Sequence, residues 1–91
     1  MKTIYKYPLE IADYNTILIP GGYEYLKIVH VGRDPYGTPC IWAEVDTAYP
    51  TMPVTAYIVG TGHPLPNPEQ LRVPQHIGSF VERVFVWHVY I

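Results

Sequence analysis

The residues best suited to chemistry form one short segment, Gly60-Thr61-Gly62-His63, which follows an alternating strand pattern and precedes Pro64 and Pro66. Two glycines around a threonine let the backbone adopt positive φ and present successive N–H groups. Such a turn can form an anion-binding nest, with the Thr61 hydroxyl and the His63 imidazole as further donors. The same residues also suit an ordinary tight turn, with glycine for geometry and proline to end strand pairing. The sequence leaves both interpretations open.

The other polar residues form no metal or catalytic motif. The chain has four histidines: His30, His63, His76 and His88. No pair of them has the close spacing of a metal site, and Cys40 is the only cysteine. A hydrolase would need a hydroxyl nucleophile, such as Thr61 or Ser79, beside a positioned base. His63 and Asp46 are available as bases, but their spacing does not favour this arrangement over chance. We expect no catalytic residues, no metal and no cofactor.

Aromatic side chains are the second feature of the sequence that suggests a ligand site. The chain contains nine tyrosines and two tryptophans, which suit interfaces and ligand walls with one apolar and one wet side. An aromatic plate beside a glycine turn and an arginine matches an adenine-and-phosphate ligand, although core packing explains most of the aromatics equally well. The candidate ligand-binding residues are Gly60, Thr61, Gly62, His63, Trp42 and Arg33.

The elements that must position these residues are short strands. Ten prolines and seven glycines divide the chain into segments rich in β-branched and aromatic residues. This predicts one all-β domain over residues 1–91, a small antiparallel sheet, sandwich or partly closed barrel of about six or seven short strands. The expected strands are Thr3–Tyr7, Thr16–Ile19, Tyr25–Val31, Cys40–Val45, Val54–Val59, Ile77–Val81 and Val84–Ile91. Residues 66–75 have room for at most one short turn of helix.

Side-chain alternation assigns faces to two of these strands. In Cys40–Val45, the residues Ile41, Ala43 and Val45 form an apolar core face, and Trp42 lies on the other side. The last strand is apolar on both faces, so it is either central in its sheet or covered by a partner. Few charges are available to cover the surface, since charged residues make up 15% of the chain. We therefore expect a homo-oligomer.

Charge and hydropathy exclude several partner classes. The net charge is −2, and the six basic residues are scattered rather than gathered on one face. A domain that binds polymeric nucleic acid normally has a concentrated basic face, so we expect no such binding. No apolar run has the length of a signal-peptide core or a membrane span. We expect no membrane partner and a cytoplasmic location.

Several segments together resemble a family of small phage and prophage proteins of unknown function. They are the opening Met-Lys-Thr-Ile-Tyr-Lys-Tyr, the segment from Pro39 to Asp46, Val59-Gly60-Thr61-Gly62-His63-Pro64, Ile77-Gly78-Ser79-Phe80 and the segment from Val84 to Val89. The resemblance spans nearly the whole chain and brings no catalytic residues with it. It implies a phage setting, in which the protein acts in the cytoplasm of the host cell.

That setting implies three functions that the residues leave open. The first is a binding protein, not an enzyme, that sequesters a nucleotide-derived immune signal of the host. Its ligand is a small phosphate-containing nucleotide held near subunit interfaces. The second is a small phosphodiesterase that cleaves such a signal, with His63 as acid or base. The third is an accessory or inhibitor protein whose aromatic surface meets another protein.

Overall fold

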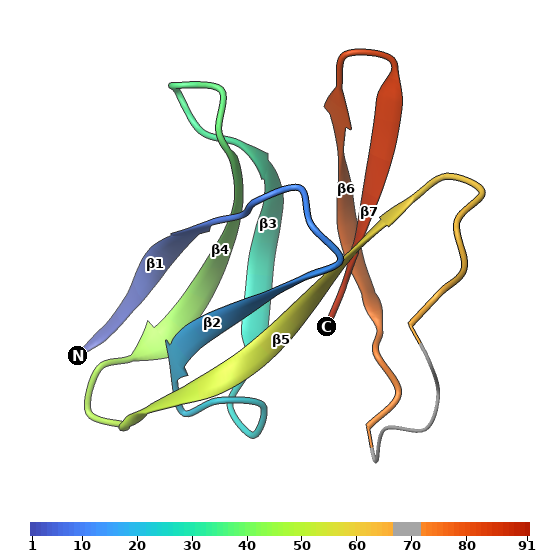
Figure 1. Cartoon of the computed structure of the whole chain (residues 1–91). Coiled ribbons are helices and arrows are strands. Elements are labelled where there is room, and N and C mark those ends of the chain that lie inside the picture. The colour runs from blue at the N-terminus through green and yellow to red at the C-terminus, as the bar shows by residue number, and fades with distance from the viewer. Residues whose placement is uncertain (67–71) are drawn as a thin grey trace.

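The computed structural model describes residues 1–66 and 72–91, which contain seven β-strands and no helix (Figure 1). The strands are β1 Lys2–Pro8, β2 Tyr14–Pro20, β3 Lys27–Arg33, β4 Pro39–Asp46, β5 Thr51–Gly60, β6 His76–Glu82 and β7 Phe85–Tyr90. Each expected strand overlaps one of these, so the all-β prediction is confirmed. The expected helical turn falls largely on residues 67–71, outside the described residues. In the part of the chain that is described, no helix has the length and apolarity needed to cross a membrane.

The strands form two antiparallel sheets in a sandwich-like arrangement, and the sheets do not close into a barrel (Figure 1). The three-stranded sheet has the order β1-β4-β3, and the four-stranded sheet has the order β2-β5-β7-β6. The two sheets are in close contact where Gly78 of β6 meets Val31 of β3. A Cβ added at Gly78 would lie 2.6 Å from the Val31 Cβ, so only glycine permits this approach.

The core lies between the sheets and follows the alternation of the strands. Ile41, Ala43 and Val45 of β4 are buried on the inner face, as predicted from the sequence. They pack with residues of the facing sheet that include Val54 of β5 and Val89 of β7. Cys40, Ile17, Ile19, Ala56, Ile58, Phe80 and Ile91 are also buried. Burial of this apolar area is the main stabilising contribution to the fold.

Strand β7 is central, because it pairs with β5 on one side and with β6 on the other. Of the two explanations for its apolar faces, the central position is confirmed. Since β7 presents no free edge along this paired stretch, its composition does not by itself argue for oligomerisation. Its first residues project with β6 as a hairpin, and there Phe85 is 58% and Val84 is 87% exposed.

Candidate functional site

Gly60, Thr61, Gly62 and His63 form a tight turn at the end of β5, called the glycine turn below. The His63 N–H donates to the Gly60 carbonyl oxygen at 2.9 Å, and Gly62 has a φ of 88°, the sign that a type II turn requires at its third residue. The Thr61 N–H donates to the Val86 carbonyl oxygen of β7 at 3.2 Å. Two of the turn's amides are therefore engaged within the protein, which favours the ordinary turn over a backbone anion nest.

The first glycine of this turn serves close packing. A Cβ added at Gly60 would lie 2.8 Å from His63 Nδ1 and 3.1 Å from Cζ3 of Trp87. Both distances are shorter than normal van der Waals contact, so a larger residue would displace the two rings. The glycine turn thus holds an imidazole and an indole on the same side of the chain, with ring centroids 6.2 Å apart.

Thr61 begins a row of four hydrogen-bonded side chains that crosses from β5 over β7 to β6. The Thr61 Oγ1 lies 2.8 Å from His88 Nε2, and His88 Nδ1 lies 2.9 Å from Ser79 Oγ. The Ser79 Oγ also lies 3.1 Å from His76 Nε2. We call Thr61, His88, Ser79 and His76 the hydroxyl–imidazole row. Of its members, Thr61 is a candidate ligand-binding residue of the sequence analysis and Ser79 was considered there as a nucleophile, whereas His76 and His88 were given no ligand-binding role.

Strand register and one irregularity bring this row together. Ser79 and His88 are cross-strand partners in the β6–β7 ladder. His76 is three residues from Ser79, so regular alternation would place it on the opposite face of the sheet. The ladder shifts register between His76 and Gly78, and this bulge turns the His76 side chain to the face of Ser79.

The row can be hydrogen-bonded in two opposite directions, because a neutral imidazole has one donor and one acceptor nitrogen. In one direction, His76 donates to Ser79, Ser79 donates to His88 and His88 donates to Thr61. The Thr61 hydroxyl then donates to the Val86 carbonyl oxygen at 3.4 Å. In the other direction, every donor between the side chains becomes an acceptor. The row therefore suits ligand groups that accept hydrogen bonds and groups that donate them.

Two hollows lie on either side of the glycine turn and share Gly60, Thr61 and His63. The first, called the polar hollow because it reaches His88 of the hydroxyl–imidazole row, has a volume of about 220 Å³ and also includes Gly62, Val59, Leu65 and Tyr90. The apolar hollow has a volume of about 470 Å³ and is bordered by the loop residue Val84 and the first residues of β7, 85–87. Both hollows have mainly apolar walls, and they differ in that the first includes His88 of the hydroxyl–imidazole row and the second includes the rings of Phe85 and Trp87.

Arg33 does not lie at the glycine turn. Its Nε donates to the Val81 carbonyl oxygen at 2.9 Å, and Nη2 donates to the same oxygen and to Glu82 Oε2 at 2.7 Å. Nη1 donates to the Gly37 carbonyl oxygen at 2.5 Å. The guanidinium therefore joins the end of β3, the turn that follows it and the end of β6. Its donors are engaged in holding the sheets together.

Trp42 lies on the three-stranded sheet, whereas the glycine turn belongs to the four-stranded sheet. Its cross-strand partners are Lys6 of β1 and His30 of β3, and its ring centroid is 5.2 Å from that of His30. The tryptophan that does contact the glycine turn is Trp87. The structure thus keeps the four residues of the turn together and places Trp42 and Arg33 elsewhere.

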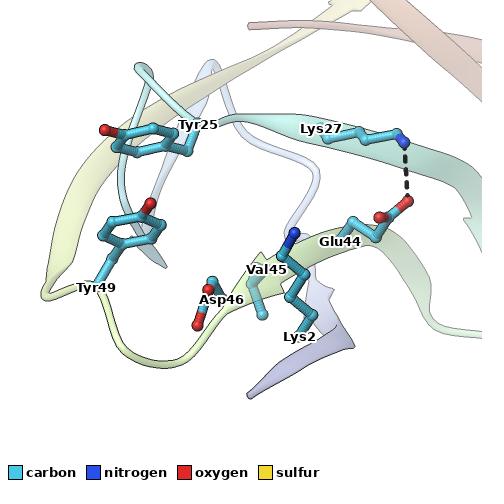
Figure 2. Close-up of a pocket in the computed structure, with 7 residues that line it drawn as sticks. All are labelled: Lys2, Tyr25, Lys27, Glu44, Val45, Asp46 and Tyr49. Carbon is cyan, nitrogen blue, oxygen red and sulfur yellow. Dashed lines mark ion pairs between the residues drawn. The ribbon is translucent and has the colours of Figure 1, made fainter.

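A further pocket, of about 200 Å³, lies beside β4 and is already balanced in charge (Figure 2). Lys27 Nζ pairs with Glu44 Oε2 at 3.1 Å, and the rings of Tyr25 and Tyr49 stack at 4.3 Å. Figure 2 shows Lys2 and Asp46 between these two pairs. The Ala48 N–H donates to Asp46 and is the main cause that lowers the pKa of this carboxyl. With two ammonium groups and two carboxylates, the pocket presents no excess charge to a ligand.

No group of three or more histidine, cysteine, aspartate or glutamate side chains that could hold a metal ion occurs among residues 1–66 and 72–91. Comparison with curated proteins and with solved structures gave no match. A family model described as a domain of unknown function, DUF7352, matches residues 1–91. Since this match covers every residue of the chain, the protein belongs to the DUF7352 family.

Proposed function

We propose that the protein is a small binding protein that sequesters a phosphate-bearing, nucleotide-type ligand at the hydroxyl–imidazole row. The observation that carries the proposal is the row itself, two members of which, Thr61 and His88, line the polar hollow beside the glycine turn. Hydroxyl and imidazole N–H groups donate to phosphate oxygens without a fixed cation. The resemblance to phage proteins supplies the class of ligand, a nucleotide-derived immune signal of the host.

Binding explains the row better than catalysis does. Its hydrogen-bonding atoms bond to one another, and none of its four members is a carboxylate. Catalytic triads usually orient the base with a third group that stabilises the imidazolium. In the row, the only group on the far side of His88 is the neutral Thr61 hydroxyl. A phosphate can replace the internal hydrogen bonds with its own.

Calorimetry with AMP, ADP-ribose and cyclic dinucleotides tests this proposal. We expect binding of at least one of these ligands by the wild-type protein, and a loss of affinity of tenfold or more in the His88→Gln variant, equivalent to about 1.4 kcal/mol. Trp42→Phe is the matched control and should retain wild-type affinity, because Trp42 lies on the other sheet. No binding across the series, or equal losses in both variants, would contradict the proposal.

A second candidate function is phosphodiester cleavage at the same row. The observation in its favour is that Ser79 Oγ lies within hydrogen-bond distance of both His88 Nδ1 and His76 Nε2. This places a hydroxyl between two groups that exchange protons. His76 and His88, rather than His63, would then serve as acid and base. Chromatography of the ligand after incubation decides the matter, because recovery of intact ligand excludes cleavage.

We propose that self-association through the tip of the β6–β7 hairpin places the site near a subunit interface. Val81, Val84 and Phe85 are each more than half exposed at this tip, so pairing of two tips would remove apolar surface from water. Light scattering at micromolar concentration should give the mass of a dimer, and Val84→Asp should give that of a monomer. A wild-type monomer contradicts self-association.

The third candidate function is that of an accessory protein, in which the exposed tip would bind another protein instead of a second copy. Pull-down of another protein by a monomer would favour this function.

A further inference from the structure

We infer that the apolar hollow beside the glycine turn is the subsite for the planar aromatic base of the ligand. The inference rests on the proposed function and deepens it, since it assigns the half of a nucleotide that the hydroxyl–imidazole row does not bind. The walls of the hollow are Gly60, Thr61 and His63 on one side and residues 84–87 on the other.

The ends of two strands create this hollow. β5 pairs with β7 as far as Gly60 opposite Trp87, and the Thr61 N–H makes one more hydrogen bond to Val86. Beyond this point the chain turns away, while β7 extends back to Phe85 in the projecting hairpin (Figure 1). Within residues 1–66 and 72–91, the first residues of β7 therefore have no neighbouring strand on the side of β5, and the space beside them is open to a small molecule.

Three rings surround the open space. The Trp87 centroid lies 6.2 Å from that of His63 at an interplanar angle of 65°, and 6.1 Å from that of Phe85 at 38°. Phe85 nevertheless remains 58% exposed, and neighbouring Val84 is 87% exposed. Rings of this kind bind a planar heteroaromatic group by stacked or edge contacts. Residues 84–87 include no charged side chain that would attract a phosphate instead.

Continuity with the hydroxyl–imidazole row selects a nucleotide base as the occupant. Thr61 borders the apolar hollow and also contacts His88 in the polar one. A ligand that places its ring beside Phe85 and Trp87 can therefore direct its phosphate across the glycine turn toward His88, whose other ring nitrogen contacts Ser79. A free aromatic ring would fill only the apolar half, and inorganic phosphate would fill only the polar half.

Tryptophan fluorescence tests the subsite directly, because the chain has only two tryptophans and they lie on different sheets. The Trp42→Phe variant retains Trp87 as its single reporter, and the Trp87→Phe variant retains Trp42. We expect AMP and adenosine to quench the fluorescence of Trp87 and to leave that of Trp42 unchanged. Inorganic phosphate should leave both unchanged. Quenching of Trp42 by adenosine, or no response of Trp87 to adenosine, would overturn the inference.

Two variants then separate the subsite from the proposed function. Phe85→Ala should weaken AMP and adenosine tenfold or more, whereas Ser79→Ala should weaken AMP and leave adenosine unchanged. Both positions are partly or largely exposed, and circular dichroism checks that each variant is folded. If calorimetry shows that AMP binding requires His88 but not Phe85, the base subsite is wrong and the proposed function stands. If adenosine quenches Trp87 while AMP binding is unaffected by Ser79→Ala and His88→Gln, the subsite stands and the proposed function is wrong.

Discussion

Strand β6 carries two polar clusters that use their hydrogen bonds in different ways. At its end, the Arg33 guanidinium donates to the backbone carbonyl oxygens of Val81 and Gly37. In its middle, the Ser79 hydroxyl lies within hydrogen-bond distance of the side chains of His76 and His88. Backbone acceptors are fixed by the fold, so Arg33 has a structural role. Side-chain partners can change their donor and acceptor roles, so the hydrogen bonds of the hydroxyl–imidazole row can rearrange without unfolding any strand.

The largest effect is expected where the two sheets meet, next to the Arg33 cluster. Gly78→Ala would place a Cβ 2.6 Å from the Cβ of Val31, and neither atom can move without its backbone. We expect a loss of about 1–3 kcal/mol in the free energy of unfolding, measured by urea denaturation.

Gly32→Ala is the matched control for this prediction. Its added Cβ would meet Nε2 of His30 at 2.7 Å, which is the far end of an exposed ring that can rotate away. We expect a smaller loss than for Gly78→Ala. Equal losses would show that the contact between β3 and β6 has no special importance.

The Arg33 cluster and the hydroxyl–imidazole row are also the features that the sequence does not predict. Proline and glycine spacing predicts all seven strands, and alternation predicts the buried face of β4. The contact of Arg33 with Val81 joins residues 48 positions apart. No local pattern indicates it, because hydrogen bonds to a backbone carbonyl place no demand on the side chain at that position.

The sequence did not indicate the hydroxyl–imidazole row, because the expected loop between β6 and β7 lies one residue before the actual loop. The expected strands Ile77–Val81 and Val84–Ile91 leave residues 82–83 as the loop, which would pair Ser79 with Val86. The actual loop is Arg83 and Val84, so Glu82 pairs with Phe85 and Ser79 pairs with His88. Arg83 adopts a φ of 57°, a conformation that hairpin loops usually assign to glycine, asparagine or aspartate. With none of these residues present, the sequence lacked the signal that sets the register.

The second prediction contrasts Arg33 with the row. Arg33→Lys keeps the positive charge but cannot reproduce the hydrogen bonds of the planar guanidinium to Val81, Gly37 and Glu82. We expect a loss of about 1–2 kcal/mol in unfolding free energy, measured by urea denaturation. Calorimetry should show unchanged AMP affinity, because the guanidinium does not reach the glycine turn. If the folded Arg33→Lys variant bound AMP more weakly, Arg33 would contribute to the ligand site after all.

The third prediction is the opposite combination, a small change in stability with a large loss of ligand affinity. Ser79→Ala removes the middle hydroxyl of the row, yet His88 retains Thr61 as a partner at 2.8 Å. We expect a change of less than about 1 kcal/mol in unfolding free energy, and a loss of AMP affinity of tenfold or more. Thermal denaturation and calorimetry on one preparation measure both quantities. A large loss of stability with normal binding would mean that the row is structural, like the Arg33 cluster.

The smallest effect concerns the turn that Arg33 supports, and it depends on pH. The Lys6 ammonium donates to Asp34 at 2.9 Å, and the amides of Thr38 and Tyr36 donate to the same carboxyl group. These hydrogen bonds, that of Lys6 foremost, lower the pKa of Asp34 in the folded protein. A carboxyl whose pKa is lower in the folded state stabilises the fold above its unfolded pKa of about 4, and this contribution is lost as the pH falls through the folded value. Asp34→Asn should therefore flatten the acid side of the stability profile measured by urea denaturation, and Lys6→Gln should flatten it partly. Ligand affinity at neutral pH should be unchanged in both variants. If the stability profile of Asp34→Asn were as steep on the acid side as that of the wild type, the Asp34 carboxyl would not couple folding to pH.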